Sequence, residues 1–300
     1  MSDVILASDI SKRYGKTTVL RHLNMAVPEG SIYGLIGQNG SGKTTTIKIL
    51  MNLITATSGR AEVLGHDSRK LSGRKFAEIA YVSENQRLPE WMTVEYFMNY
   101  LRPFYPNWDT VLEEQLLRDF HLPKDRRLKH LSRGMRMKAV LASSLAYHPR
   151  LIVMDEPFSG LDPLARDELS AGMLENADGA TVFISSHDLA DIESFTSHIG
   201  YLEQGRLQFT EDMNSLIQRF REVEVTTDAT SRMPREQWPA NWVNPEQSSA
   251  LVRFVETNFE TERTLAEVRR IFGDTRHVEL KAMPLRSIFV TLAKAGREAE

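Results

Sequence analysis

The chain has 300 residues, of which 41% are hydrophobic and 26% charged, so its size and composition allow one large globular domain or one large and one small. The net charge of −3 gives no indication of a basic nucleic-acid-binding surface, and the absence of cysteine excludes disulfides and thiolate metal sites. The sequence has neither a run of 18 apolar residues nor a basic N-terminal leader, so we expect a cytosolic protein without a transmembrane helix.

The first quarter of the sequence alternates between strand-like and turn-like segments. Residues 4–6 and 18–27 are predicted to be strands. Residues 31–37 form a short apolar strand that enters a glycine-rich turn. Residues 44–53 then have the apolar spacing of a helix. A strand, a glycine-rich turn and a helix therefore follow one another.

The glycine-rich turn contains the strongest motif of the sequence. It fits the pattern G-x-x-x-x-G-K-[ST] with Gly37, Gln38, Asn39, Gly40, Ser41, Gly42, Lys43 and Thr44. Glycines let backbone N–H groups approach phosphate oxygens, and the next helix adds its N-terminal N–H groups. Lys43 is expected to reach the β- and γ-phosphates, and Thr44 to offer its hydroxyl to Mg²⁺. A glycine turn with an accidental lysine is the alternative, but the strand before it and the helix after it favour phosphate binding.

The sequence between residues 88 and 149 is helical and rich in aromatic side chains. Val94, Phe97, Leu101 and Phe104 recur at three- and four-residue steps and are expected to share one helix face. Most of the aromatic residues are expected in a core. A few, such as Trp91 and Phe97, are candidates for a groove that receives a partner helix, since aromatic residues are enriched as interface anchors.

Two short apolar runs, residues 151–154 and 181–184, suit buried parallel strands, and a helical pattern at 163–174 separates them. Asp155 and Glu156 follow the first run, at the carboxyl edge where open parallel sheets bind ligands. Asp155 suits Mg²⁺, and Glu156 suits the orientation or deprotonation of an attacking water. The pair alone would indicate a solvated strand end, but together with the glycine-rich loop it favours catalysis.

The sequence changes character after residue 221. Residues 222–226 and 251–255 alternate like half-buried strands, and a polar loop with Pro234, Pro239 and Pro245 separates them. A charged helix, a strand and a last amphipathic helix are expected at residues 261–272, 277–280 and 285–295. We interpret residues 222–300 as a small α+β accessory domain.

These residues resemble the ATP-binding cassette (ABC) family over about residues 4–220. The resemblance rests on Tyr14, the loop from Gly37 to Thr44, Glu84, Leu131-Ser132-Arg133-Gly134-Met135, Asp155-Glu156-Pro157, Ser159-Gly160-Leu161-Asp162 and His187. The runs Tyr81-Val82-Ser83-Glu84 and Trp91-Met92-Thr93-Val94-Glu95 look most like the drug- and antibiotic-exporter branch. The implied fold is α/β, a P-loop NTPase (RecA-like) core with an antiparallel β subdomain and a helical subdomain at about 88–149. The nucleotide-binding domain would span residues 1–221.

The resemblance implies roles for residues outside the strongest motifs. Tyr14 would stack on adenine, although a tyrosine after a strand can also be a core residue. Thr45 would add a donor to the phosphate cradle, which Asn39 and Ser41 line. His187 would bond the γ-phosphate beside the catalytic Glu156, although a lone histidine is more often structural.

The segment from Leu131 to Met135 resembles the family's signature motif. Ser132 and Gly134 would grip the γ-phosphate of ATP bound to the opposite subunit, and Asp162 would cross the same interface. The resemblance thus implies a head-to-tail dimer. The residues alone indicate a helix N-terminus capped by Ser132.

Three residues depart from the family pattern. Arg133 and Met135 replace the usual second glycine and the glutamine of the signature, and Glu84 stands where a glutamine usually faces Mg²⁺. Glu84 keeps an oxygen for the metal but adds a negative charge near the phosphates, and Gln86 is a nearby substitute. The expected metal ligands are Thr44, Asp155 and Glu84.

The resemblance implies an ATP-hydrolysing subunit that uses ATP and Mg²⁺ to power transport, with export expected, through a separate transmembrane permease. A homodimer on the inner face of the cell membrane is the expected assembly, without a nucleic-acid partner. A soluble ABC ATPase acting on nucleic acid or the ribosome is disfavoured by the single cassette and the mildly acidic charge. A P-loop kinase would leave the signature segment and His187 as coincidences.

Overall fold

The structure is a computed structural model that describes residues 2–84, 86–177, 179–227, 238–248, 250–273 and 275–298. The chain divides into two compact units, Met1–Thr210 and Glu211–Glu300. We expected the first domain to reach residue 221, but the segment before that residue bonds within the second unit. The guanidinium of Arg219 contacts the Glu211 carboxylate at 2.7 Å and donates to the backbone oxygen of Thr257 at 2.7 Å.

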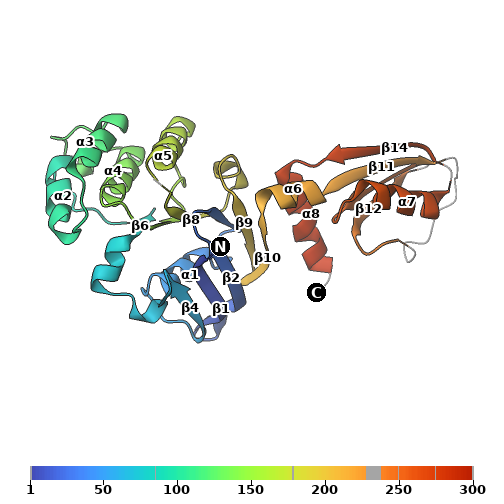
Figure 1. Cartoon of the computed structure of the whole chain (residues 1–300), viewed down its shortest axis with the longest axis horizontal. Coiled ribbons are helices and arrows are strands. Elements are labelled where there is room, and N and C mark those ends of the chain that lie inside the picture. Colours follow the sequence, from blue (N-terminus) through green and yellow to red (C-terminus); the bar gives the residue numbers. More distant parts are fainter. Residues whose placement is uncertain are drawn as a thin grey trace. The chain divides into compact units, whose positions relative to one another are not determined.

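The central sheet of the first unit consists of β3 (Ile32–Ile36), β6 (Ile79–Ser83), β7 (Leu151–Asp155), β8 (Thr181–Ser186), β9 (His198–Glu203) and β10 (Arg206–Asp212). Its strand order is β10-β9-β3-β8-β7-β6, and Figure 1 labels β6, β8, β9 and β10 of this sheet. β3 pairs in parallel with β8 and β9, and β7 pairs in parallel with β6 and β8. The predicted parallel α/β sheet is therefore confirmed.

A second, antiparallel sheet of the first unit has the order β2-β1-β4-β5. Its strands are β1 (Asp3–Tyr14), β2 (Thr17–Pro28), β4 (Ser58–Val63) and β5 (His66–Asp67). β1 is much longer than the strand expected at residues 4–6. Its register shifts between Ala7 and Ile10, where Asp9 has a φ of 52°. This bulge interrupts the two-residue alternation on which the strand prediction depended.

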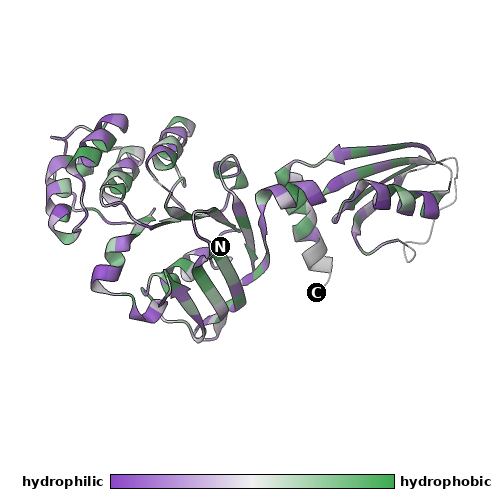
Figure 2. Ribbon diagram, viewed as in Figure 1, coloured by the Kyte–Doolittle hydropathy of each residue, from purple (hydrophilic) through white to green (hydrophobic). Residues whose placement is uncertain are grey.

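The hydrophobic core of the first unit joins both sheets to helix α1 (Lys43–Leu50). Ile5 and Leu20 from the antiparallel sheet, Leu35 and Phe183 from the parallel sheet, and Ile47 from α1 are all fully buried in one cluster. Figure 2 shows the hydrophobic residues following these strands. Burying apolar surface contributes about 25 cal/mol per Å². The packing therefore holds α1, and with it the loop that precedes it, against the parallel sheet.

Further helices of the first unit are α2 (Val94–Leu101), α3 (Thr110–Asp119), α4 (Arg133–Leu145) and α5 (Pro163–Asn176). Short 3₁₀ turns occupy Ser68–Lys70, Gly73–Glu78, Arg102–Phe104, Leu128–His130 and Leu189–Asp191. Val94 and Phe97 are buried as expected, but Phe104 is 64% exposed. The chain tightens into a 3₁₀ turn at Pro103, which takes Phe104 off the buried face.

The second unit contains one antiparallel sheet in the order β12-β13-β11-β14. The strands are β11 (Arg221–Thr227), β12 (Trp242–Ser248), β13 (Leu251–Glu256) and β14 (Thr275–Ala282), and the helices are α6 (Met213–Arg219), α7 (Thr261–Phe272) and α8 (Leu285–Glu298). The predicted α+β composition is thus present. In neither unit does any described helix have both the length and the apolar character needed to cross a bilayer.

The edge strand β12 contains Pro245, in a segment that we expected to be a polar loop. Its pairing with β13 shifts register between Val243 and Glu246. Proline cannot donate a backbone hydrogen bond and is tolerated at such edge and bulge positions. The loop prediction is therefore wrong for residues 242–248. Pro239 precedes the strand, and Pro234 lies outside the described residues.

Candidate functional site

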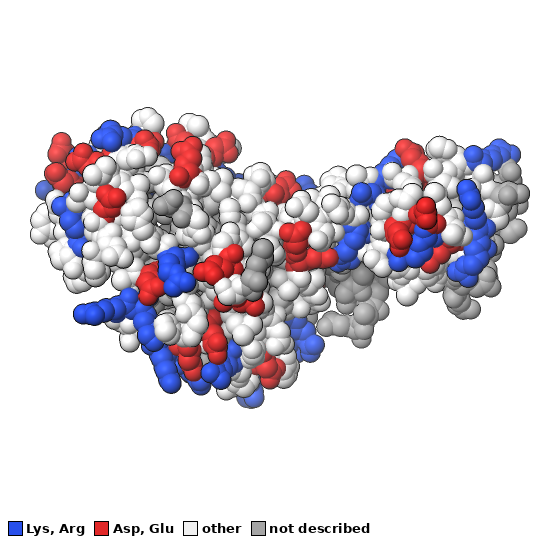
Figure 3. Space-filling view, viewed as in Figure 1, with Lys and Arg blue, Asp and Glu red and all other residues white. Residues whose placement is uncertain are grey.

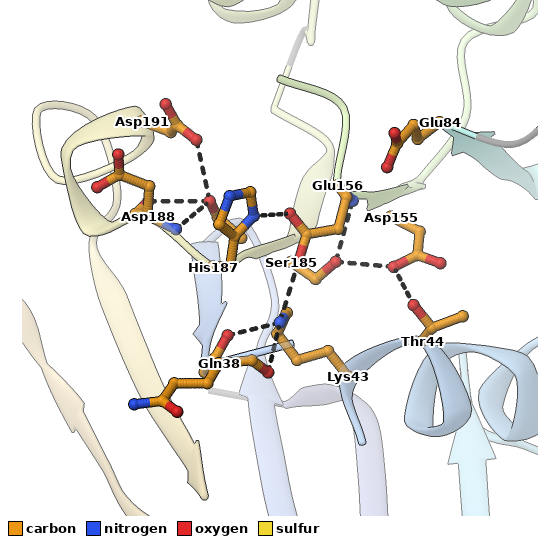
Figure 4. A network of polar contacts seen from close by, with 12 residues as sticks. Gln38, Lys43, Thr44, Glu84, Asp155, Glu156, Ser185, His187, Asp188 and Asp191 are labelled. Carbon is orange, nitrogen blue, oxygen red and sulfur yellow. Dashed lines mark hydrogen bonds and ion pairs between the residues drawn. The ribbon is translucent and has the colours of Figure 1, made fainter. Parts of the chain in front are cut away.

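Three strands of the parallel sheet bring their carboxyl ends to one edge, and Figure 4 shows the polar side chains that gather there. β3 leads into the loop that begins at Gly37, β7 ends at Asp155, and β8 leads to His187. The register pairs Ile36 with Ser186 and Asp155 with Ser185. Residues that are far apart in the sequence therefore form one row at the edge where ligands bind in sheets of this kind.

Glycines shape the loop between β3 and α1. Gly40 and Gly42 have φ values of 84° and 114°, in the region that favours glycine. A Cβ on Gly37 would lie 2.2 Å from the backbone oxygen of Leu202. Gly42 is the N-cap of α1 and no described side chain caps the helix. The backbone N–H groups at this helix start are therefore available to an anion.

Two polar side chains point into the loop. The Ser41 hydroxyl is buried and has no hydrogen-bond partner among the described residues. Lys43 is only 5% exposed, and its ammonium donates to the backbone oxygens of Gly37 at 2.5 Å and Gln38 at 3.2 Å. A buried hydroxyl without a partner is costly, and a buried ammonium requires anionic or polar partners. The loop therefore fits a polyphosphate.

Asp155 is held beside this loop by two hydroxyl groups. Its Oδ1 accepts from Thr44 Oγ1 at 3.0 Å and from Ser185 Oγ at 2.9 Å. Burial raises the pKa of Asp155 above its ordinary value, and the two hydrogen bonds oppose that rise. The described residues contain no cluster of three His, Cys, Asp or Glu side chains that would hold a metal alone. A carboxylate, a hydroxyl and phosphate oxygens together suit Mg²⁺, which rarely has an all-protein cage.

The carboxylate of Glu156 contacts both Lys43, at the end of the glycine-rich loop, and His187, which follows β8 (Figure 4). Its backbone has a φ of 53°, and its N–H donates to Ser185 Oγ at 3.1 Å. One carboxylate oxygen lies 3.1 Å from Lys43 Nζ, and the other accepts from His187 Nδ1 at 2.7 Å. A left-handed backbone in a non-glycine residue is often found at functional sites. The structure thus brings both expected catalytic residues into direct contact.

Sequence reasoning did not single out Ser185. Its hydroxyl donates to Asp155 and accepts from the Glu156 backbone, so it holds the Asp155 carboxylate and the Glu156 main chain. The available signal was its position at the polar end of the buried strand predicted at 181–184. A fully buried serine at the carboxyl end of a strand needs a partner there.

The residues expected to contact adenine and to line the phosphate cradle differ in their exposure to solvent. Tyr14 ends β1 and is 48% exposed, with Lys12 Nζ 4.9 Å from its ring centre, so the core alternative is wrong. Asn39 is exposed in the loop, and Thr45 is half-buried in the first turn of α1. Thr45 and Asn39 therefore lie on the glycine-rich loop and the helix start that follows it, whereas Tyr14 belongs to the antiparallel sheet.

Ser132, Gly134 and Asp162 lie at the starts of two helices. Ser132 Oγ accepts from the Met135 N–H at 3.2 Å and caps α4, and Asp162 accepts from the Ala165 N–H at 2.9 Å and caps α5. Both side chains are exposed. A Cβ on Gly134 would lie 3.0 Å from the Ala165 methyl group, so this glycine also allows α4 and α5 to pack closely.

Glu84 is the third residue that we expect to be a metal ligand, but its side chain contacts Arg133. Its carboxylate pairs with the Arg133 guanidinium, while Thr44 and Asp155 bond to each other. Its backbone N–H donates to the Asp155 carbonyl at 3.1 Å. The nearby substitute, Gln86, is exposed. Among the contacts of the described residues, the structure therefore brings Thr44 and Asp155 together and leaves the Glu84 carboxylate outside that pair.

Comparisons with known proteins agree with this geometry. The family model described as "ABC transporter" matches residues 20–159. The bacitracin transport ATP-binding protein BcrA of Enterococcus faecalis is 31% identical over 225 residues, covering 74% of this chain and 73% of that protein. The lantibiotic transport ATP-binding protein SrtF of Streptococcus pyogenes is 34% identical over 204 residues, covering 66% of this chain and 86% of that protein.

A solved structure of an ATP-binding subunit of an ABC transporter matches with a TM-score of 0.65 and 30% identity, covering 72% of this chain and 92% of that one. A dimeric bacterial ABC transporter cassette, 23% identical with a TM-score of 0.62, shows the same fold. These matches confirm the predicted P-loop NTPase fold. The chain belongs to the ABC transporter family, as an ATP-binding subunit that hydrolyses ATP.

Proposed function

We propose that ATP binds with its triphosphate in the loop from Gly37 to Thr45 and that Glu156 activates the attacking water. The arrangement of Glu156 between Lys43 and His187 carries this proposal. Lys43 would exchange its contacts with the loop oxygens and Glu156 for contacts with the β- and γ-phosphates. Glu156 is then free to accept a proton from water, and His187 holds it in place and reaches the γ-phosphate.

Thr44 and Asp155 would hold Mg²⁺, which when bound neutralises phosphate charge. The hydroxyl of Ser185 fixes the orientation of the Asp155 carboxylate at 2.9 Å. The exposed ring of Tyr14 is proposed to stack on adenine. Glu84 is proposed as a third metal-facing residue only when it leaves Arg133.

A second copy of this chain is the proposed partner at the signature segment. Ser132 and Asp162 are exposed polar side chains at helix starts, where N–H groups favour anions. With Gly134 they would contact the γ-phosphate bound to the other copy. ATP would then stabilise the closed dimer, because the γ-phosphate contacts both copies and hydrolysis removes that contact.

The proposed membrane partner is a permease that docks at a cavity of about 780 Å³ in the first unit. Its apolar lining includes Leu128, Leu131 and Met137, and its charged lining includes Arg87 and Arg136. Such a mixture of apolar and charged side chains is typical of interfaces.

Two further observations support this membrane partner. Trp91 is 62% exposed and available as an anchor, whereas Phe97 is buried and belongs to the core. The names of two relatives, a bacitracin and a lantibiotic transport ATP-binding protein, support a peptide antibiotic as the transported molecule. Export is the proposed direction, with this chain on the inner face of the membrane.

Acidic and basic side chains are interspersed on the face shown in Figure 3. With a net charge of −3, this distribution supports the proposal that nucleic acid is not a partner.

ATP titration of the wild-type chain and of Lys43→Ala tests the proposed site. Removing the ammonium should weaken ATP binding by roughly a hundredfold or more, because a charge-assisted contact with the phosphates is lost in a buried setting. The exposed Lys70 provides the matched control, and Lys70→Ala should bind ATP like the wild type. Equal ATP affinity of Lys43→Ala and the wild type would contradict the proposed site.

A further inference from the structure

Two of the residues that depart from the family pattern contact each other. The resemblance to the ABC family implies a glutamine at the position of Glu84 and a glycine at the position of Arg133. The structure pairs Arg133 Nη2 with Glu84 Oε1 across 49 positions of sequence. The two unusual charges of opposite sign therefore form one ion pair.

Glu84 lies next to the residues that would hold Mg²⁺. Its N–H donates to the Asp155 carbonyl at 3.1 Å, and the preceding Ser83 is in register with Asp155. Asp155 in turn accepts from Thr44. An unpaired carboxylate here would lie within about a Debye length, roughly 10 Å, of a bound triphosphate and would repel it.

Arg133 is placed to neutralise this carboxylate. It is the first residue of α4, and its guanidinium lies against Gly160, where an added Cβ would be 2.7 Å from Nη1. Gly160 therefore leaves space for the Arg133 side chain to reach Glu84. The nearby Arg136 is committed elsewhere, since it donates to the backbone oxygens of Leu128 and Lys129.

We propose that Arg133 is a positioning residue for the ATPase reaction, which neutralises Glu84 and turns that carboxylate away from the triphosphate. This proposal rests on the proposed function of the site. The carboxylate of Glu84 has two mutually exclusive uses, because it faces either Arg133 or the metal. The pair therefore makes a glutamate tolerable at a position beside the phosphates, and it must open before Glu84 can serve the metal.

A double-mutant cycle on ATP affinity tests the proposal, with the variants Arg133→Gln, Glu84→Gln and both together. The titrations use the full chain with ATP and EDTA at low salt, so that no metal compensates the carboxylate. Arg133→Gln should weaken ATP binding by roughly fivefold, because it exposes the Glu84 charge to the triphosphate. Glu84→Gln alone should bind ATP at least as well as the wild type. The double variant should return to within about twofold of the wild type.

Controls separate the ion pair from a structural role of α4. Arg133→Lys keeps the charge and should keep the wild-type affinity. Arg136→Gln removes a second arginine of α4 and should show no coupling with Glu84→Gln. The effect of Arg133→Gln should also shrink at high salt, since half-exposed charges are screened. Melting temperatures of all variants report whether the fold is intact.

The outcomes distinguish this proposal from the proposed function. A wild-type chain that binds ATP, with an Arg133→Gln variant of unchanged affinity, would overturn the positioning role alone. A double variant as weak as Arg133→Gln would also overturn it, because Arg133 would then act without Glu84. A wild-type chain without affinity for ATP would overturn the proposed site and this inference together.

Discussion

Each compact unit buries a carboxylate, and the two carboxylates have different partners. In the second unit, Glu256 is fully buried and accepts three N–H groups. They come from Trp242 Nε1 at 2.9 Å, Asn241 Nδ2 at 2.6 Å and the Asn258 backbone at 2.9 Å. These donors cannot accept, so they fix the carboxylate in one role. Glu256 therefore stabilises the sheet of the second unit.

In the first unit, the side-chain donors that Asp155 has among the described residues are the hydroxyl groups of Thr44 and Ser185, at the carboxyl end of a parallel sheet. A hydroxyl can rotate, and it can accept as well as donate. The Thr44 hydroxyl can thus turn its lone pairs to a cation while Asp155 offers its charge. The two units therefore differ in the kind of donor around a buried carboxylate, since fixed N–H groups hold Glu256 and rotatable hydroxyl groups hold Asp155.

The largest expected effect comes from Asp155→Asn. The amide has the same size but no charge for Mg²⁺, so Mg²⁺-dependent ATP hydrolysis should fall by about a hundredfold or more. The melting temperature should not fall, because burial raises the pKa of Asp155 and its charged form is unfavourable there. Steady-state hydrolysis and thermal unfolding measure the two effects. The exposed Asp167→Asn is the control, and full activity of Asp155→Asn would contradict a role of Asp155 in holding Mg²⁺.

Glu256→Gln should lower the stability of the fold and leave ATP hydrolysis unchanged, the reverse of Asp155→Asn. Its amide nitrogen would face donors that need an acceptor, so the free energy of unfolding should fall by about 1–3 kcal/mol. ATP hydrolysis should remain at the wild-type rate. Urea denaturation and the hydrolysis rate test this prediction, with the exposed Glu260→Gln as control. A loss of ATP hydrolysis without a loss of stability in Glu256→Gln would contradict the structural role of Glu256.

The smallest effect is the pH dependence that Asp155 causes. Because burial raises the pKa of Asp155, lowering the pH through the raised value protonates it and weakens Mg²⁺ binding above the ordinary aspartate range. The stability of the fold depends on pH in the opposite direction. The folded chain takes up this proton at higher pH than the unfolded chain, so the residue's contribution to the free energy of unfolding rises as the pH falls.

Mg²⁺ titrations of ATP affinity at a series of pH values test this dependence. The wild-type chain should lose Mg²⁺ affinity as the pH falls through the raised pKa of Asp155. Asp155→Asn should show no such loss. A loss of Mg²⁺ affinity only at the ordinary aspartate pKa would contradict the effect of burial.

The sequence was most informative where local pattern and tertiary position agree. The helix at Thr261–Phe272 and the strands around Leu151–Asp155 and Thr181–Ser186 form where apolar spacing placed them, because these elements follow their regular period without interruption. The loop at Gly37 could be predicted for the same reason, since its motif requires a strand before it and a helix after it.

Other features depend on contacts that no local pattern contains. Pro245 lies in a strand because β12 is an edge with a bulge, and Phe104 is exposed because the helix ends before Pro103. The partner of Glu84 is an arginine far along the chain, and no spacing rule connects the two. The direction of a long polar side chain is decided by its neighbours in space and only weakly by its neighbours in sequence.

The role of Glu156 in activating water is tested most directly by single-turnover hydrolysis by Glu156→Gln with Mg²⁺ and ATP, together with the affinity for ATP. Glutamine keeps the size of the side chain but cannot accept a proton from water. The hydrolysis rate should fall by about a hundredfold to ten-thousandfold while ATP binding is retained. Hydrolysis at the wild-type rate would contradict the role of Glu156 as the base at this sheet edge.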